Sequence, residues 1–188
     1  MEDRPLEEER LVERAQRGEL DAYEELVRRH QTIAFRTAYL HTRSAAEAED
    51  AAQEAFVKAW RAIGRFRLGA PFRPWVLRIV ANEARNRAVA AGRRERLARR
   101  AGEERRPGGA VPPPETALLA SERRIEIAGA LDRLPERERL VLQCRYLLEL
   151  SEAETAVVVG CASGTVKSRT SRALTRLRRE LGPEVENA

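Results

Sequence analysis

The sequence contains little cysteine and few aromatic residues. Its two cysteines, Cys144 and Cys161, do not form a C-x-x-C pair and are too few for a disulfide framework. We therefore expect two buried thiols in a reducing compartment. Aromatic residues make up 5% of the chain. Any hydrophobic core must therefore depend on leucine, valine, isoleucine and alanine.

Long apolar segments are also missing. No uninterrupted apolar run approaches the roughly 20 residues that a membrane-spanning helix needs. The N-terminus, Met1 to Pro5, is acidic where a secretory signal would be basic and then apolar. We expect a cytoplasmic protein with no direct membrane insertion, which would reach a membrane only through a partner.

Patterns typical of catalysis or cofactor binding are absent as well. His30 and His41 do not stand at a metal-ligand spacing with a cysteine or an acidic cluster. There is no G-x-x-x-x-G-K-[ST] phosphate loop and no nucleophile signature, although a triad assembled in space stays open at this point. One acidic helix face suits a basic partner better than a metal ion. It carries Glu47, Glu49, Asp50 and Glu54. We predict a protein that is not an enzyme and uses no metal or cofactor.

Charged residues, by contrast, are abundant. They make up 35% of the chain, and the formal net charge is +5, with the excess on arginine. A basic chain favours a polyanionic partner. Alanine, glutamate, arginine and leucine recur throughout and β-branched runs are scarce, which predicts an all-α fold.

One segment interrupts the helical pattern. Residues 101–117 read AGEERRPGGAVPPPETA, and their prolines and glycines cannot continue a helix. Such a stretch is typical of a semi-extended tether. We predict two small helical domains, residues 1–98 and 118–188, joined by a Pro/Gly-rich linker over 99–117.

Several local signals predict where helices begin. Asp21 with Glu24, Ser44 with Glu47 and Ser151 with Glu154 all have the spacing of a capping box. Pro74 suits the first turn of another helix. Three aromatic residues surround the Gly/Pro-rich loop over 64–74. We expect Phe66 and Trp75 in the core and Phe72 exposed, where it could stack on unpaired bases.

The segment 151–177 has the layout of a helix-turn-helix, with Gly160 suited to end the first helix and Ser163 to cap the second. In such motifs the start of the second helix enters the major groove of duplex DNA. The alternative is an arginine-rich helix that is merely solvated, and the pattern alone does not decide between the two. The candidate DNA contacts are Ser163, Thr165, Lys167, Ser168, Arg169, Arg172 and Arg176.

A second polar stripe follows the Gly/Pro-rich loop. A charged stripe is often only a solvated face, and that alternative stays open here. Asparagine is a poor helix former, so Asn82 and Asn86 within a helix favour contact with bases. The candidate contacts of this stripe and the preceding loop are Phe72, Arg73, Arg78, Asn82, Arg85 and Asn86.

Two parts of the chain resemble one family. AEDAAQEAFVKAWRAIGRF (48–66) and FRPWVLRIVANEARNR (72–87) are similar to the second domain of bacterial sigma factors. ALDRLPERERLVLQCRYLLELSEAETAVVVGCASGTVKSRTSRALTRLRREL (130–181) resembles their fourth domain. The lack of a further domain between the two resembles the compact extracytoplasmic-function (ECF) group.

The resemblance implies a factor that binds core RNA polymerase and directs promoter-specific initiation. It assigns the helix-turn-helix candidates to the duplex −35 element. The loop and stripe candidates are assigned to a −10 element that becomes single-stranded, with one base held in a loop pocket. It also implies a linker directed toward the RNA exit path, and an anti-sigma factor as a possible partner. The implied polymerase contacts are Asp50, Gln53, Glu54, Lys58 and Trp60.

The sequence departs from the family pattern at four positions: Asn86 stands where many relatives carry Asp, Pro74 replaces a small residue, and Glu152 and Thr155 replace aromatic and apolar residues. We expect Thr155 to weaken packing between the two motif helices.

Two rival functions stay open: a dimeric helix-turn-helix regulator, for which we find no dimerisation helix, and a helical adaptor that acts only through proteins.

Overall fold

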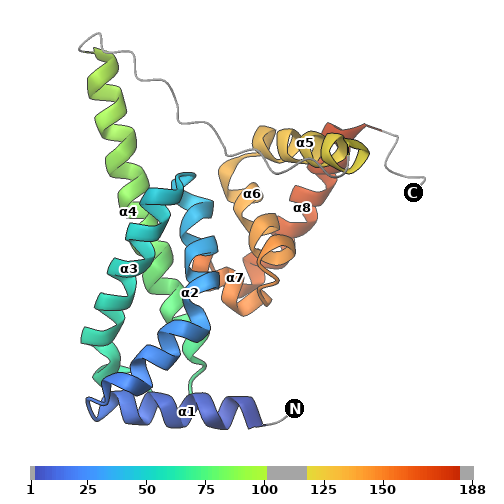
Figure 1. Ribbon diagram of the computed structural model, residues 1–188. Coiled ribbons are helices and arrows are strands. Elements are labelled where there is room, and N and C mark those ends of the chain that lie inside the picture. Colours follow the sequence, from blue (N-terminus) through green and yellow to red (C-terminus); the bar gives the residue numbers. More distant parts are fainter. Residues whose placement is uncertain (1–2, 101–117, 183–188) are drawn as a thin grey trace. The chain divides into compact units, whose positions relative to one another are not determined.

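The computed structural model describes the backbone of residues 3–100 and 118–182 (Figure 1). All regular elements within these ranges are helical, which confirms the predicted all-α fold. The chain divides into two compact units, Met1–Arg105 and Arg106–Ala188. Two helical domains were predicted, and two are found. Residues 101–117, most of the expected linker, lie outside the described residues, so the exact domain boundaries stay a prediction.

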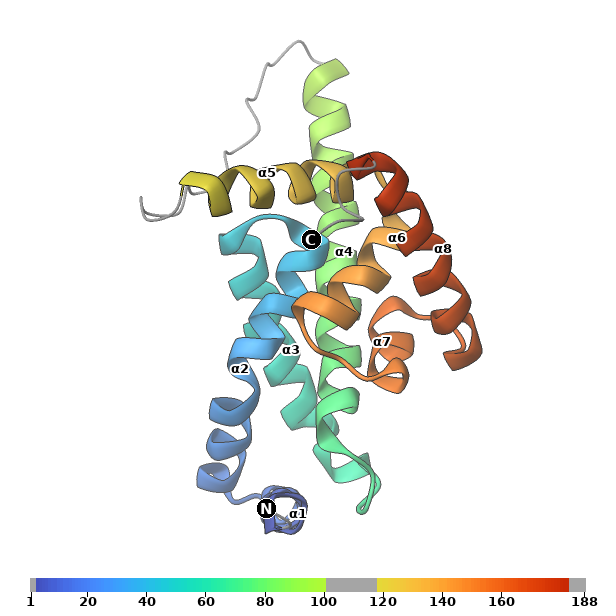
Figure 2. The same cartoon turned by 90° about the vertical axis from the view of Figure 1, so that its right-hand side faces the viewer.

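The first unit contains α1 (Asp3–Gln16), α2 (Leu20–Thr42), α3 (Ala45–Ala62), the short 3₁₀ helix η1 (Ile63–Arg65) and α4 (Phe72–Arg100). Helices α2, α3 and α4 lie side by side, and α1 crosses them at one end (Figures 1 and 2). Alanine supplies much of the core between the three long helices, which permits a close approach of their backbones. The buried alanines that α2, α3 and α4 contribute to this core are Ala22, Ala34, Ala38, Ala48, Ala51, Ala52, Ala55, Ala59 and Ala84.

The helix starts of the first unit follow the sequence signals only in part. Ser44 caps α3 as predicted, because its hydroxyl accepts a hydrogen bond from the Glu47 amide at 3.4 Å. The predicted Asp21–Glu24 capping box is wrong. Helix α2 begins at Leu20, two residues too early for Asp21 to be its cap, and Glu19 occupies the cap position. The Asp21 carboxylate instead pairs with Arg14, 2.7 Å away.

The second unit contains α5 (Leu118–Arg133), α6 (Glu136–Leu142), one π-helical turn η2 (Gln143–Leu147), α7 (Glu152–Val159) and α8 (Ser163–Leu181). Helix α8 packs against α5, α6 and α7. Small apolar clusters hold these helices together. Their buried members are Leu134, Leu142 and Ala173 in one cluster and Val141, Ala156 and Val166 in another.

The turn between α7 and α8 has the geometry of a helix-turn-helix. The Ser151–Glu154 capping box forms with both reciprocal bonds, at 3.2 and 2.8 Å, and opens α7. Gly160 ends α7 in the left-handed conformation, with φ of 72°, as predicted. Ser163, in contrast, does not cap α8. The capping position belongs to Ala162, and Ser163 is the first helical residue.

Candidate nucleic-acid interface

The polar stripe of α4 faces away from the core of the first unit. Arg78, Asn82 and Asn86 are exposed, whereas Arg85 is half-buried and donates a hydrogen bond to the Asn82 side-chain oxygen at 3.2 Å. The opposite side of the helix is fully buried at Val76, Val80 and Ala84. Helix α4 therefore holds two amides and two guanidinium groups on one accessible face. The structure brings these predicted site residues together, and their contact with DNA stays a prediction.

His41, near the end of α2, lies close to this stripe. Burial and the nearby Arg85 guanidinium lower the pKa of the imidazole to about 4. A neutral imidazole adds no repulsion to Arg85. His41 is therefore uncharged beside Arg85 of the α4 stripe at neutral pH.

The expected exposure of Phe72 is wrong. Phe72 is 1% exposed and packs against His30, Phe66 and Trp75, with ring centroids 5.4 to 5.8 Å apart. It is the first residue of α4, and the helix turns its ring into the core instead of leaving it in the loop. Phe66 is buried and Trp75 partly buried, as predicted. Phe72 can support the loop but offers no ring to a base.

The loop borders an open cavity of about 1050 Å³. Its walls are formed by α1, α2 and residues 66–73. At its edge His30 and Glu8 form a contact of 2.8 Å that ties α1 to α2. The hydrogen bond with His30 lowers the pKa of Glu8 against the opposing effect of burial. The half-buried Arg73 also lines the cavity.

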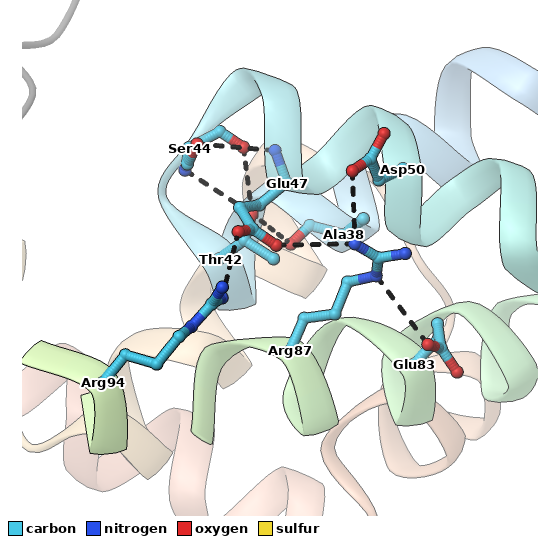
Figure 3. A network of polar contacts seen from close by, with 8 residues as sticks. All are labelled: Ala38, Thr42, Ser44, Glu47, Asp50, Glu83, Arg87 and Arg94. Carbon is cyan, nitrogen blue, oxygen red and sulfur yellow. Dashed lines mark hydrogen bonds and ion pairs between the residues drawn. The ribbon is translucent and has the colours of Figure 1, made fainter. Parts of the chain in front are cut away.

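The acidic face of α3 is largely balanced by cations of α4. Asp50 and Gln53 are exposed, as expected for a docking surface, and Glu54 is half-buried. Figure 3 shows Arg87 of α4 between the carboxylates of Glu47 and Asp50, at 3.5 and 3.3 Å. Glu47 also contacts Arg94 at 3.4 Å. The face is therefore less negative than its sequence indicates.

Two other predicted polymerase contacts already have partners within the chain. Lys58 is exposed and pairs with Glu83 of α4 and, at 3.8 Å, with Glu54. Trp60 is half-buried, and its ring lies 4.9 Å from that of Tyr23. Only part of Trp60 therefore remains accessible to a partner.

Sequence reasoning missed the role of Arg87. Arg87 contacts Glu83 at 3.8 Å on its own helix, in addition to the two carboxylates of α3. The spacing of four residues between Glu83 and Arg87 was a signal for the first contact. The contacts across helices depend on how α3 and α4 pack, which no local pattern contains.

Helix α8 presents most of its predicted contacts to solvent. Ser163, Lys167, Ser168, Arg172 and Arg176 are exposed, and Thr165 and Arg169 are half-buried. On the other side of the helix Val166 and Ala173 are fully buried. The structure thus orients the start of α8 as a helix that reads a DNA groove requires.

Two arginines of α8 differ in their freedom to reach DNA. The Arg172 guanidinium donates a hydrogen bond to the Ser168 carbonyl of its own helix at 3.2 Å. It can exchange this hydrogen bond for one to a phosphate or a base. Arg176 pairs with Glu138 of α6 at 3.4 Å. Arg176 therefore takes part in holding α8 against α6, which the sequence did not indicate.

Thr155, on the first helix of the motif, is fully buried. Its hydroxyl has no hydrogen-bond partner among the described residues. A buried hydroxyl without a partner is unfavourable. The expected weakening of packing between the two motif helices stays a prediction.

The described residues contain neither a cluster of metal ligands nor a helix suited to span a membrane. No three side chains of His, Cys, Asp or Glu lie together as metal ligands within those ranges. Within the same ranges, none of the helices combines the length and the apolar character needed to cross a bilayer.

The two units match two known protein families. Residues 26–94, in the first unit, match Sigma-70 region 2, and residues 124–177, in the second, match Sigma-70 region 4. The two matches occur in the order that the resemblance implied for the second and fourth sigma domains.

Whole-chain comparisons agree with the two family matches. The chain is 36% identical to the RNA polymerase sigma-H factor of Pseudomonas aeruginosa, over 97% of each protein. It is also 36% identical to the ECF RNA polymerase sigma-E factor of Escherichia coli K12, over 89% of this chain and 91% of that one. With two helical units, a helix-turn-helix and relatives of this similarity, the chain belongs to the bacterial RNA polymerase sigma factors, in the ECF group. It acts in transcription initiation.

Solved structures of two complexes contain chains with the same fold. One is the sigma factor RpoE bound to the anti-sigma factor NepR from Bartonella quintana, with a TM-score of 0.62 and 25% identity over 84% of this chain and 97% of that one. The other is CnrH in complex with the cytosolic domain of CnrY, with a TM-score of 0.65 and 24% identity over 91% of this chain and 94% of that one.

Proposed function

We propose that the two units divide promoter recognition between them. Helix α8 reads the duplex −35 element, and the α4 stripe with the neighbouring loop binds the −10 element as its strands separate. The observation that carries this proposal is the orientation of α8, which exposes Lys167, Ser168 and Arg172 along the first half of a helix whose other face is buried. Such a surface combines charge for phosphate with donors for base edges.

The dock for core RNA polymerase is assigned to α3. Asp50 and Gln53 are its exposed polar residues, with Glu54, Lys58 and Trp60 at its margin. Polymerase would compete with Arg87 for Asp50. We therefore expect the affinity of the chain for core polymerase to fall as salt is added. The chain supplies no catalytic group of its own. It lowers the cost of opening DNA for the polymerase, which carries out the chemistry in the cytoplasm.

An anti-sigma factor is a further proposed partner. The RpoE structure from Bartonella quintana, which shares this fold, contains one. A free-standing dimeric regulator is the less favoured function, because the chain matches a sigma factor over 97% of its length.

Arg172→Ala tests the assignment of α8. Promoter DNA is first selected from random sequences with the wild-type holoenzyme, and transcription is then measured with each variant. We expect initiation to fall about fivefold or more, since a lost base contact costs about 1–3 kcal/mol, while binding to core polymerase is retained. The matched control is Arg137→Ala, which removes an exposed arginine of the same unit outside α8. Equal loss of polymerase binding, or unchanged initiation, would contradict the assignment.

A further inference from the structure

The outer face of α2 carries two exposed aromatic rings. Phe35 and Tyr39 are 37% and 40% exposed and lie one helical turn apart. Their rings stack, with centroids 6.2 Å apart and an angle of 26° between the planes. Ala34 and Ala38, next to them in sequence, are fully buried. The face therefore presents aromatic surface that the core of the unit does not use.

A cation accompanies the two rings. Arg36 lies between Phe35 and Tyr39 in sequence, is exposed, and forms no ion pair within the described part of the chain. The carboxylate of Glu25, one acidic group of α2, already contacts Arg28 and Arg29. The charge left for a partner on this face is therefore positive, which complements phosphate.

This face is continuous with the cavity beside the loop. Thr32 and Arg36 line that cavity from α2, and residues 66–73 line it from the loop. Its α1 side carries Glu7, Glu8 and Glu9, which disfavour a polyanion there. A strand leaving the loop would therefore follow α2 and not α1.

We propose that Thr32, Phe35, Arg36 and Tyr39, which we name the α2 platform, bind unpaired DNA that extends beyond the loop. Bases stack on the two rings, and Arg36 holds a phosphate. Aromatic faces combined with a free cation are the usual means of binding single strands without reading their sequence. The inference rests on the proposed function of the loop and adds a second contact surface for the same strand.

The test uses holoenzyme reconstituted with core RNA polymerase and the double variant Phe35→Ala/Tyr39→Ala. The probes are fork-junction DNAs that share one duplex and carry single-stranded non-template extensions of increasing length. We expect the variant to bind the longer extensions about fivefold more weakly or worse, because stacking contributes about 1–3 kcal/mol per base. The shortest extension, the duplex alone and core polymerase should bind as they do to the wild type.

Two variants serve as controls. Tyr146→Ala removes a 59% exposed tyrosine from the second unit and should leave all affinities unchanged. Phe35→Trp/Tyr39→Trp keeps aromatic surface and should restore binding to the longer extensions. A loss with every probe, or no rescue by tryptophan, would show a structural role and overturn the platform.

Other outcomes separate this inference from the proposed function. If the alanine variant loses affinity for core polymerase, the α2 face binds protein and the inference is wrong. If the alanine variant binds every probe and core polymerase as the wild type does, the inference is also wrong. Asn82→Ala/Arg85→Ala is measured in parallel. If only this variant weakens fork-junction binding, the proposed role of the stripe stands and the platform alone fails; if neither variant has an effect, both fail.

Discussion

At the scale of single residues, Thr155 shows how a polar side chain in the core limits stability. Its hydroxyl is fully buried and has no partner among the described residues, although the residue lies on a short helix packed against α8. Threonine and valine have nearly the same shape. Replacing the hydroxyl with a methyl group therefore removes an unfavourable buried group without opening a cavity.

We expect Thr155→Val to raise the free energy of unfolding of the second unit by about 1 kcal/mol. This free energy of unfolding is measured by denaturant titration, with circular dichroism as the signal. Thr170→Val is the matched control, because the Thr170 hydroxyl donates to the Val166 carbonyl at 2.9 Å and should gain nothing from replacement. A Thr155→Val protein that is less stable than the wild type would show that the hydroxyl is satisfied in solution.

Two residues also show what sequence could not predict. Phe72 stands between Pro71 and Arg73, a polar setting that favoured exposure. Its burial depends on His30 of α2, 42 positions earlier, and on the point at which α4 begins. The role of Arg87 likewise depends on the packing of α3 against α4. Local patterns contain neither piece of information.

At the scale of helices, local chemistry predicted much more. Capping signals located the starts of α3 and α7, and Gly160 located the end of α7. These predictions succeeded because a cap depends on a few neighbouring residues. The Asp21 prediction failed because an aspartate in a first helical turn can form an ion pair instead, here with Arg14.

The different roles of two serines provide a test of the helix starts. Ser151→Ala removes both the hydroxyl that caps α7 and half of its capping box, so we expect a loss of about 1 kcal/mol in the free energy of unfolding. Ser163→Ala should change it by only a few tenths of that, because Ala162 holds the cap position of α8. Equal losses for the two variants, measured by denaturant titration, would contradict the assigned caps.

At the scale of the whole molecule, the chain combines two units with different surfaces. The first presents an acidic face on α3, a polar stripe on α4 and the α2 platform. The second presents the start of α8. Their predicted order was visible in the sequence because both family motifs are long and specific. The individual DNA contacts were harder to predict, since exposure, ion pairs and aromatic packing decide which side chains remain available.

The most direct test of the central claim is gel filtration of the purified chain with bacterial core RNA polymerase. We expect co-elution as a stoichiometric complex, and separate elution of the folded variant Asp50→Arg/Glu54→Arg, whose reversed charges oppose a basic partner. Normal co-elution of the variant would show that the dock lies elsewhere. A wild-type chain that is folded by circular dichroism but elutes apart from core polymerase would contradict the assignment as a sigma factor.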